Sequence, residues 1–291
     1  MKAESLKADG VLLFITAIWG VTFIVVKDAL SLADPYSFLS LRFTVGAAAL
    51  VVFSFRELRD ARVWKRGGVL GILLFTGYAF QTVGLKYSTP SRSAFITGLI
   101  VIFIPFVSWG FLRKRPSWTV LVGALIATAG LTQLTNLTVE FSLPWGDVLS
   151  LGCAVAYAVQ IVLTGEMARE VSPLALVTAE LTVTAALSWV SKAFTASNVS
   201  YTPALWGAVL VTGLIASAFA IGVQTWAQAR TSAVHVGLIF TLEPVFAAAF
   251  STALGREVLS MREWFGGGLI LAGVAFGELI PLLRNKSAPA E

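Results

Sequence analysis

The sequence is poor in charge. Only 13% of its 291 residues are Asp, Glu, Lys or Arg, whereas about 25% is usual for a soluble domain. Hydrophobic residues make up 57% of the chain, and the mean hydropathy is +0.82. This composition leaves little room for a soluble domain and predicts a polytopic membrane protein. The net charge of +5 does not indicate a nucleic-acid partner, because the basic residues lie in short loops between apolar runs.

Cysteine and the common catalytic motifs are also missing. Cys153 is the single cysteine, which excludes an internal disulfide and a thiolate metal cluster. The sequence has no Asp pair, no His-x-x-x-His, no Gly-x-Ser-x-Gly and no phosphate-binding glycine loop followed by Lys-Ser/Thr. An intramembrane lipid-modifying enzyme usually needs paired acids with a metal, or an acid and a base at a membrane face. We therefore expect no cofactor, no metal, no ATP drive and no enzymatic activity.

Long apolar runs fill most of the chain. About twenty residues cross a ~30 Å hydrocarbon core, and ten runs reach that length. The first run follows a short charged leader without an obvious small-residue cleavage site, so we interpret it as a retained span. The predicted spans are 9–27, 35–55, 67–85, 92–112, 118–135, 146–165, 173–195, 203–226, 232–254 and 263–283.

The distribution of Lys and Arg predicts the orientation of these spans. The N-terminus, the loops after every second span and the C-terminus together carry 14 basic residues, and the opposite side carries 6. Basic residues concentrate on the cytoplasmic side of membrane proteins. We therefore expect a multi-pass protein of the cytoplasmic (inner) membrane with both termini in the cytoplasm, surrounded by membrane lipids.

The two halves of the sequence match each other. Residues 93–105 and 232–244 share six identities in thirteen positions without a gap. Similar short matches occur in the same order elsewhere, so that spans 2 to 5 correspond to spans 7 to 10. We therefore divide the chain into repeats at 1–139 and 140–291. The other matches pair Pro35 with Pro173, Thr44 with Thr182, Gln81 with Gln224, Gly123 with Gly266 and Gly130 with Gly273.

A repeat of five spans has a topological consequence. An odd number of crossings inverts the second copy relative to the first. Inverted repeats produce a pseudo-two-fold axis in the membrane plane, with substrate bound near the midplane where the halves meet. The predicted fold is therefore an all-α membrane protein of ten transmembrane helices, arranged as two inverted five-helix repeats around a central cavity.

Several short motifs together resemble a known family. The chain is similar to the drug/metabolite transporter superfamily, specifically to its EamA-type ten-helix members. This resemblance implies a basket of helices whose third, fourth, eighth and ninth spans contribute most to the cavity wall. It also implies a solute exporter or exchanger of the cytoplasmic membrane, although it does not name the solute. The motifs are Trp19-Gly20, Leu41-Arg42-Phe43 after Pro35, Gly84-Leu85-Lys86-Tyr87, and the stretch from Ala227 through Leu242-Glu243-Pro244-Val245-Phe246 to Gly255-Arg256-Glu257 and Gly266.

The ninth span carries an acid and a proline at half depth. Pro244 removes one backbone hydrogen bond and breaks the helix, and Glu243 lies about 17 Å into the span at 1.5 Å per residue. An intramembrane acid is a functional candidate by default. Glu243 therefore titrates a proton or binds a cationic part of the solute, unless it is a structural carboxyl that ties two helices together. In the first repeat, Ile104-Pro105 occupies the equivalent position, so Pro105 predicts a second helix break without an acid.

Arg42 and Glu180 occupy equivalent positions in the two repeats, each seven residues after its matched proline. Because the repeats are inverted, the two side chains enter from opposite faces, and a vertical gap of about 10 Å separates them in a ~30 Å core. We therefore expect no direct ion pair between them. Arg42 binds Glu243 or a solute carboxylate, or it snorkels to the outer headgroups. Glu180 either takes an ionic role in coupling or snorkels inward to the headgroups.

Three amides and three aromatic rings lie deep within predicted spans. Buried amides need hydrogen-bond partners, so each one bonds to a neighbouring helix or presents donors and acceptors to a solute. Belt aromatics lie at span ends, so rings at depth line the cavity or pack against neighbouring helices. The candidate substrate-binding residues from these groups are Trp19, Tyr78, Gln81, Tyr157, Gln160 and Gln224.

Two further features have ambiguous roles. His235, the only histidine, lies at the cytoplasmic start of the ninth span, where it acts as a proton relay or as a solvated interfacial side chain. Gly123, Gly130, Gly273 and Gly277 have the spacing of close helix contacts. They predict tight packing of spans 5 and 10, within one chain or across a homodimer.

These observations favour a secondary transporter for a small organic solute such as an amino acid or a related metabolite. Transport by alternating access, as export or exchange, follows from the expected symmetry. A proton gradient drives it if Glu243 titrates, whereas facilitated exchange needs no such residue. The alternatives are an intramembrane lipid-modifying enzyme and a passive channel, although the polar residues gather at half depth rather than in a file open at both ends.

We predict that reporters fused to residue 1 and to residue 291 lie on the same, cytoplasmic side of the membrane. Green fluorescent protein should fluoresce at both positions, and alkaline phosphatase should be inactive at both. Opposite results at the two ends would exclude two inverted five-span repeats.

Overall fold

The computed structural model describes residues 2–88, 90–113, 115–134, 144–196, 199–255 and 258–286. Two residues of the motifs above, Arg256 and Glu257, lie outside the described residues. Within the described ranges the chain is helical, and no strand is formed. The elements are α1 (Lys2–Ala29), α2 (Pro35–Ser54), η1 (Glu57–Arg59), α3 (Ala61–Lys86), α4 (Pro90–Gly98), α5 (Ile100–Leu112), α6 (Trp118–Leu134), α7 (Trp145–Met167), α8 (Pro173–Ala193), α9 (Pro203–Leu210), the π-helix η2 (Val211–Phe219), α10 (Ala220–Gln228), α11 (Ala233–Phe240), α12 (Glu243–Ala253) and α13 (Met261–Lys286).

Eight stretches of the described chain are long and apolar enough to cross a membrane. They coincide with predicted spans 1 to 4 and 6 to 9. The fifth predicted span coincides with a shorter apolar helix, Trp118–Gln133, and α13 covers the tenth. The all-helical membrane architecture therefore agrees with the sequence, while ten membrane crossings remain a prediction.

Local sequence signals explain where several helices begin. Proline occupies the first residue of α2, α8 and α9, a position where its missing N–H leaves no hydrogen bond unmade. Asp34 and Thr202 precede α2 and α9, and their side chains accept hydrogen bonds from the backbone N–H of Ser37 and Leu205. Such caps satisfy N–H groups that the helix itself cannot pair.

The helix break expected at Pro244 is present. α11 ends at Phe240 and α12 begins at Glu243, and the N–H groups of Thr241 and Leu242 donate to carbonyls three residues back. The break expected at Pro105 is wrong, because α5 continues through Pro105 and the chain turns earlier, at Leu99. Pro105 deprives only the carbonyl of Val101 of its N–H partner, and the helix continues on both sides of this gap.

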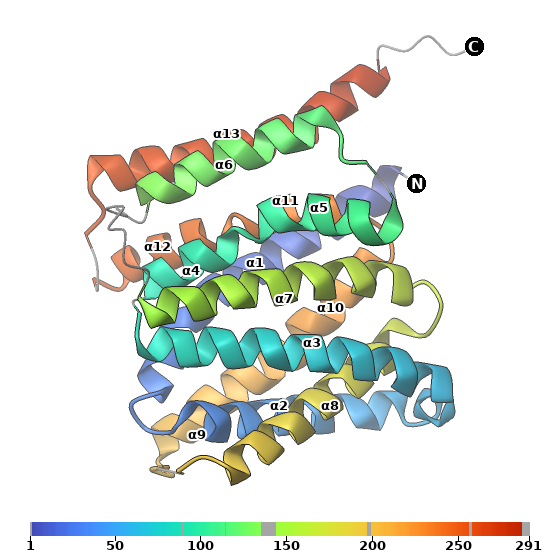
Figure 1. Ribbon diagram of the computed structural model, residues 1–291, viewed down its shortest axis with the longest axis vertical. Helices are drawn as coiled ribbons and strands as arrows, with labels where there is room; N and C mark the ends of the chain where they lie inside the picture. The colour runs from blue at the N-terminus through green and yellow to red at the C-terminus, as the bar shows by residue number, and fades with distance from the viewer. Residues whose placement is uncertain are drawn as a thin grey trace.

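The helices form three groups in Figure 1. The pair α6 and α13 lies along one edge, α2, α8 and α9 lie along the opposite edge, and the other long helices lie between them. α2 packs on α8, and α3 packs on both α7 and α8. α1 packs on α10, α11 and α12, so the first helix of the chain lies against its last third.

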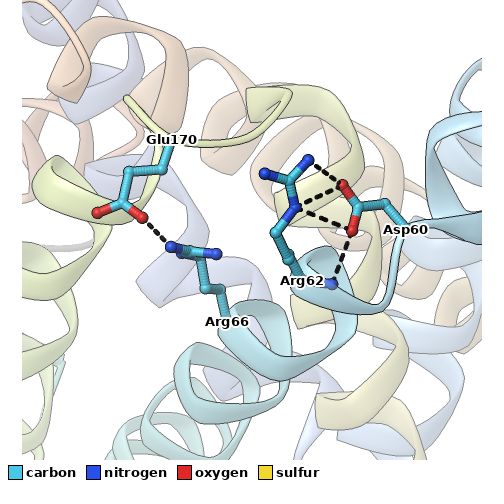
Figure 2. A network of polar contacts seen from close by, with 4 residues as sticks. All are labelled: Asp60, Arg62, Arg66 and Glu170. Atoms are coloured by element: carbon cyan, nitrogen blue, oxygen red, sulfur yellow. Dashed lines mark hydrogen bonds and ion pairs between the residues drawn. The ribbon is translucent and has the colours of Figure 1, made fainter.

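Charged side chains gather at the start of α3, as Figure 2 shows. Asp60 caps α3 by accepting a hydrogen bond from the backbone N–H of Arg62 at 2.9 Å, and the Arg62 guanidinium donates to both of its oxygens. The hydrogen bonds from Arg62 lower the pKa of Asp60 below its usual value. Arg66 pairs with Glu170, which joins α3 to the segment between α7 and α8. Both ion pairs lie on the side expected to face the cytoplasm.

The glycines of α6 and α13 allow these two helices to pack at short distance within one chain. A Cβ added to Gly273 would lie 2.6 Å from Ala127 N and Gly123 O, and one added to Gly130 would lie 2.6 Å from Gly266 O. These are backbone atoms, which cannot turn aside as a flexible side chain can. The helix–helix contact predicted from the glycine spacing is therefore present.

We predict that Gly273→Ala lowers the melting temperature of the detergent-solubilised protein, because overpacking costs about 1–3 kcal/mol. Gly268→Ala is the matched control on the same helix, since nothing lies within 4 Å of a Cβ there. Thermal unfolding followed by tryptophan fluorescence measures both. Equal melting temperatures for the two variants would contradict the packing argument.

Candidate functional site

A cavity lies among the helices of the middle group, and α2 of one outer group completes its wall. Its volume is about 80 Å³, counted as the space open to the centre of a water molecule. On this measure one water needs about 10–15 Å³, so the cavity holds about five to eight waters or one small solute. Its walls come from α1, α2, α3, α4, α5, α7, α10, α11 and α12. Eight of the residues singled out in the sequence line it: Trp19, Arg42, Tyr78, Gln81, Tyr157, Gln160, Gln224 and Glu243.

Arg42 is buried inside the molecule, with 3% of its surface exposed. Its Nε donates to Ser217 Oγ at 2.8 Å, and its Nη2 donates to the Tyr78 hydroxyl at 3.2 Å. The guanidinium also lies over the Tyr78 ring, 4.6 Å from the ring centroid. Arg42 therefore points inward, and the snorkelling alternative does not describe its position. Within the described part of the chain no carboxylate lies within 4 Å of it, so neutral partners leave its positive charge uncompensated.

Aromatic rings form one wall of the cavity. The Tyr78 ring meets those of Phe43 and Tyr157 edge to face, at centroid distances of 4.9 and 5.5 Å. Gly77 makes room for this arrangement, since a Cβ there would lie 2.2 Å from the Tyr157 ring. The Tyr157 hydroxyl is enclosed and has no hydrogen-bond partner among the described residues. A bound molecule could therefore reach this hydroxyl only after the side chains around it move.

The π-helix η2 supplies two partners that the sequence did not indicate. Ser217 accepts the hydrogen bond from Arg42, and the carbonyl of Ala216 accepts one from Trp19 Nε1 at 2.9 Å. The N–H of Ala220 donates to Ile215 O, five residues back, which is the π pattern. π-helical turns occur frequently at functional sites. The only signal in the sequence is a run of small residues within an apolar span, which is too common to identify such a turn.

The three candidate amides have different environments. Gln160 Nε2 donates to Glu180 Oε1 at 2.7 Å. Gln224 Nε2 donates to Gln228 Oε1 at 3.2 Å, and Gln228 in turn donates to Ile161 O at 3.1 Å. Gln81 makes no side-chain hydrogen bond among the described residues. Gln81 is therefore the amide whose donors and acceptor are all available to the cavity.

Glu243 is the first residue of α12 and faces the cavity. A carboxylate at this end of a helix is stabilised by the helix dipole. Within the described ranges its side chain has no ion-pair or hydrogen-bond partner. Arg42 therefore does not bind Glu243 directly, and the cavity is lined by a guanidinium and a carboxyl group that do not pair with each other.

Glu180 lies behind the cavity wall rather than on it. It is fully buried, so it does not snorkel, and it reaches the cavity only through its hydrogen bond with Gln160. No ion pair joins Glu180 to Arg42 in the part of the chain that the structure describes, as the predicted vertical gap requires. Pro105 and Pro244 shape the helices but do not line the cavity.

His235 belongs to a second hollow of about 470 Å³. Its Nε2 lies 2.7 Å from Asp9 Oδ1 of α1. α11 runs from this hollow to the first cavity, and Val236 and Ile239 are buried between the two in the largest apolar cluster. This cluster separates His235 from the residues around Glu243.

We predict that Gln81→Ala leaves the melting temperature unchanged, because its side chain makes no hydrogen bond within the protein. Gln228→Ala should lower it by a few degrees, because this variant breaks a buried chain of hydrogen bonds worth about 1 kcal/mol each. Thermal unfolding of the two purified variants checks the contrast. A clear loss of stability in Gln81→Ala would assign that amide to packing.

Known proteins that resemble this chain match it over nearly its whole length. The model of the EamA-like transporter family matches residues 6–135 and 144–277. An uncharacterized transporter of Archaeoglobus fulgidus is 33% identical, over 93% of this chain and 85% of the relative. The inner membrane transporter YhbE of Escherichia coli is 27% identical, over 93% and 91%. A crystal structure with 23% sequence identity superimposes with a TM-score of 0.80, over 94% of this chain and 98% of the other, and shows that the two folds are alike.

Proposed function

We propose that this chain, which belongs to the EamA-like transporter family, is a secondary transporter for a small zwitterionic solute. The solute is an amino acid or a close relative, carried across the cytoplasmic membrane by alternating access. One observation carries this proposal: a single small cavity is lined by a buried cation, Arg42, and an acid, Glu243, and neither has a partner of opposite charge among the described residues.

A zwitterion satisfies both charges at once. Arginine binds carboxylates through two parallel N–H···O bonds, so Arg42 binds the carboxylate of the solute. Glu243 binds the ammonium group. Apolar residues such as Ile100, Ile161 and Ile221 also line the cavity, and they contact the side chain of the solute. Leaving an unpaired charge in such a site is costly, so a solute with only one of the two groups binds less tightly.

Ten spans in two inverted repeats form the scaffold of this mechanism. Glycines at nearly equivalent positions of the two halves make similar contacts. A Cβ added to Gly71 of α3 would lie 2.7 Å from Glu180 O, and one added to Gly213 of η2 would lie 2.8 Å from Arg42 O. Glu180 and Arg42 are matched positions of the two repeats, and the two glycines precede the matched Gln81 and Gln224 by ten and eleven residues. These paired contacts support the pseudo-two-fold axis on which alternating access depends.

The arrangement of the chain ends also supports an even number of crossings. The start of α1 and the end of α13 lie on the same side of the molecule in Figure 1. Toward that side, the buried cluster with Ile104, Val236 and Ile239 separates the cavity from the second hollow. In the proposed cycle this apolar cluster opens, and the solute leaves through the second hollow.

Glu243 couples the solute to protons in this proposal. A carboxylate holds either a proton or an ammonium group at one time, so protonation of Glu243 releases the solute. Deprotonation on the other side of the membrane prepares the site for the next solute molecule. This competition produces exchange of a proton for a solute, and it needs no cofactor.

Counterflow tests the proposed function. Proteoliposomes preloaded with an unlabelled amino acid such as leucine should accumulate labelled leucine faster than empty ones, and a panel of amino acids extends the test to other side chains. Competition by 4-methylpentanoate, which lacks the amine, and by 3-methylbutylamine, which lacks the carboxylate, should be at least about tenfold weaker, because a charged hydrogen bond contributes about 1.5–3 kcal/mol. A pore or an enzyme would show no acceleration for any amino acid, and equal competition by both analogues would exclude a zwitterion site.

We predict that Glu243→Gln abolishes the response of uptake to an imposed proton gradient and weakens binding of the amine-bearing solute. The variant keeps the shape of the side chain while removing its charge. Glu263→Gln is the control, since Glu263 is a half-buried acid outside the cavity lining whose carboxylate accepts hydrogen bonds from Ser260 just before α13. Unchanged uptake across a pH series in Glu243→Gln would remove Glu243 from the coupling mechanism.

A further inference from the structure

Gln160 and Glu180 form a buried pair behind the cavity. Gln160, on α7, lines the cavity and has 2% of its surface exposed. Glu180, on α8, is fully buried, and its Oε1 accepts the hydrogen bond from Gln160 Nε2 at 2.7 Å. The other oxygen, Oε2, has no partner among the described residues. The pair therefore connects the solute site to a carboxylate that the solute itself does not reach.

Burial of the Glu180 carboxyl group lowers the stability of the fold. Within the described ranges no Lys, Arg or His lies within 4 Å of it. A buried carboxylate with few hydrogen bonds destabilises a protein, and an apolar side chain of similar volume is often neutral or better. α7 and α8 each pack on α3, so an apolar side chain would serve as well at position 180 if packing were the only role of this residue.

The backbone of Glu180 is held in place and cannot carry the carboxylate into the cavity. Thr184 Oγ1 donates to Glu180 O at 2.8 Å and to Gly71 O at 3.1 Å. α3 packs so closely here that a Cβ on Gly71 would lie 2.7 Å from Glu180 O. Glu180 therefore acts on the cavity through the Gln160 side chain.

The chemistry of the pair determines which end of the amide faces the solute. A carboxylate only accepts hydrogen bonds, whereas an amide has a donor end and an acceptor end. In the structure the NH₂ group of Gln160 faces Glu180, whose Oε1 accepts its hydrogen bond. A carboxyl oxygen that carries no proton accepts in this way whether or not the other oxygen is protonated. Its Oε1 has no hydrogen-bond partner in the described chain and is not among the fully enclosed unpaired atoms, so this acceptor is available on the cavity side.

We infer that Glu180 is a positioning residue that determines specificity: by holding the Gln160 amide in one orientation, it presents an acceptor to the solute and selects for N–H donors. This inference rests on the proposed function and adds to it. The ammonium group of the solute binds Gln160 Oε1 together with Glu243. Arg42 and Glu180, the matched charges of the two repeats, thus act on opposite ends of one solute, Arg42 directly and Glu180 through Gln160.

The first experiment needs no solute. The chain contains five glutamines, so protein labelled with ¹⁵N in the glutamine side chains has five pairs of amide signals, and the Gln160 pair is the one that disappears in Gln160→Met. Glu180→Gln and Glu180→Asp should both shift this pair and speed its hydrogen exchange, because the first replaces a carboxyl group by an amide that also donates and the second shortens the side chain by one methylene. Glu180→Gln adds a sixth pair of signals, so Glu180→Asp identifies the Gln160 pair without that addition. Thr178→Val is the control. It removes a buried hydrogen bond between α8 and Ser54 of α2 and should leave the Gln160 signals unchanged. Gln160 signals that do not respond to either Glu180 variant would overturn the inference.

The second experiment measures specificity in the counterflow assay with leucine and its two analogues. Glu180→Gln should reduce the preference for leucine over 4-methylpentanoate by about tenfold, and the preference over 3-methylbutylamine should stay unchanged because Arg42 is intact. A merely structural role would reduce both preferences together, and that result would overturn the inference.

The double variant Gln160→Glu/Glu180→Gln provides a rescue. It exchanges donor and acceptor across the pair, keeps the total charge and again leaves a carboxylate oxygen for the cavity. It should restore the preference for the amine, and failure to do so while the protein remains folded would contradict the inference. If the wild-type protein shows no preference for the zwitterion, the proposed function fails, and the amide signals alone decide whether Glu180 positions Gln160.

Discussion

The buried guanidinium of Arg42 constrains the structure around it. A charge inside an apolar helical bundle is costly unless polar groups surround it, and here Ser217, Tyr78 and the rings of Tyr78 and Phe43 perform this role. These partners come from α2, α3 and η2, so the charge can be held only when the three helices are packed together. Because all of them are neutral, the positive charge remains available to a ligand.

The cavity also depends on close backbone contacts elsewhere in the bundle. Where α3 crosses α8 and η2 crosses α2, glycine removes the side chain that would keep the helices apart. Because the helices approach closely at these crossings, larger side chains such as Tyr78 and Tyr157 determine the size of the cavity. The separate contact of α6 with α13 lies at the edge of the molecule (Figure 1), away from the polar residues. Packing and solute recognition thus occupy different parts of the same fold.

The sequence was most informative where one residue type has one physical consequence. Proline at the start of α2, α8 and α9 and at the break before α12 behaved as its missing N–H requires. It was least informative where packing against other helices determines the local structure or the position of a side chain. Pro105 lies within a continuous helix and the chain turns at Leu99 instead, because the loss of one backbone hydrogen bond does not by itself end a helix. For Glu180 the sequence leaves two alternatives, an ionic role in coupling or snorkelling inward, and the structure shows it one side chain behind the cavity wall, hydrogen-bonded to Gln160.

Composition and the spacing of apolar runs, by themselves, determined that this is a helical membrane protein, and they identified the polar residues at depth. Those properties follow from the free-energy cost of exposing charge and unpaired backbone groups to lipid. Each segment must avoid this cost by its own residues, so its sequence alone reveals them. Only the tertiary structure decided which of those residues face one another, which face the cavity and which lie behind it. The partners of Arg42, Trp19 and Gln160 come from helices distant in the sequence, and their meeting depends on how each helix is rotated and packed against its neighbours.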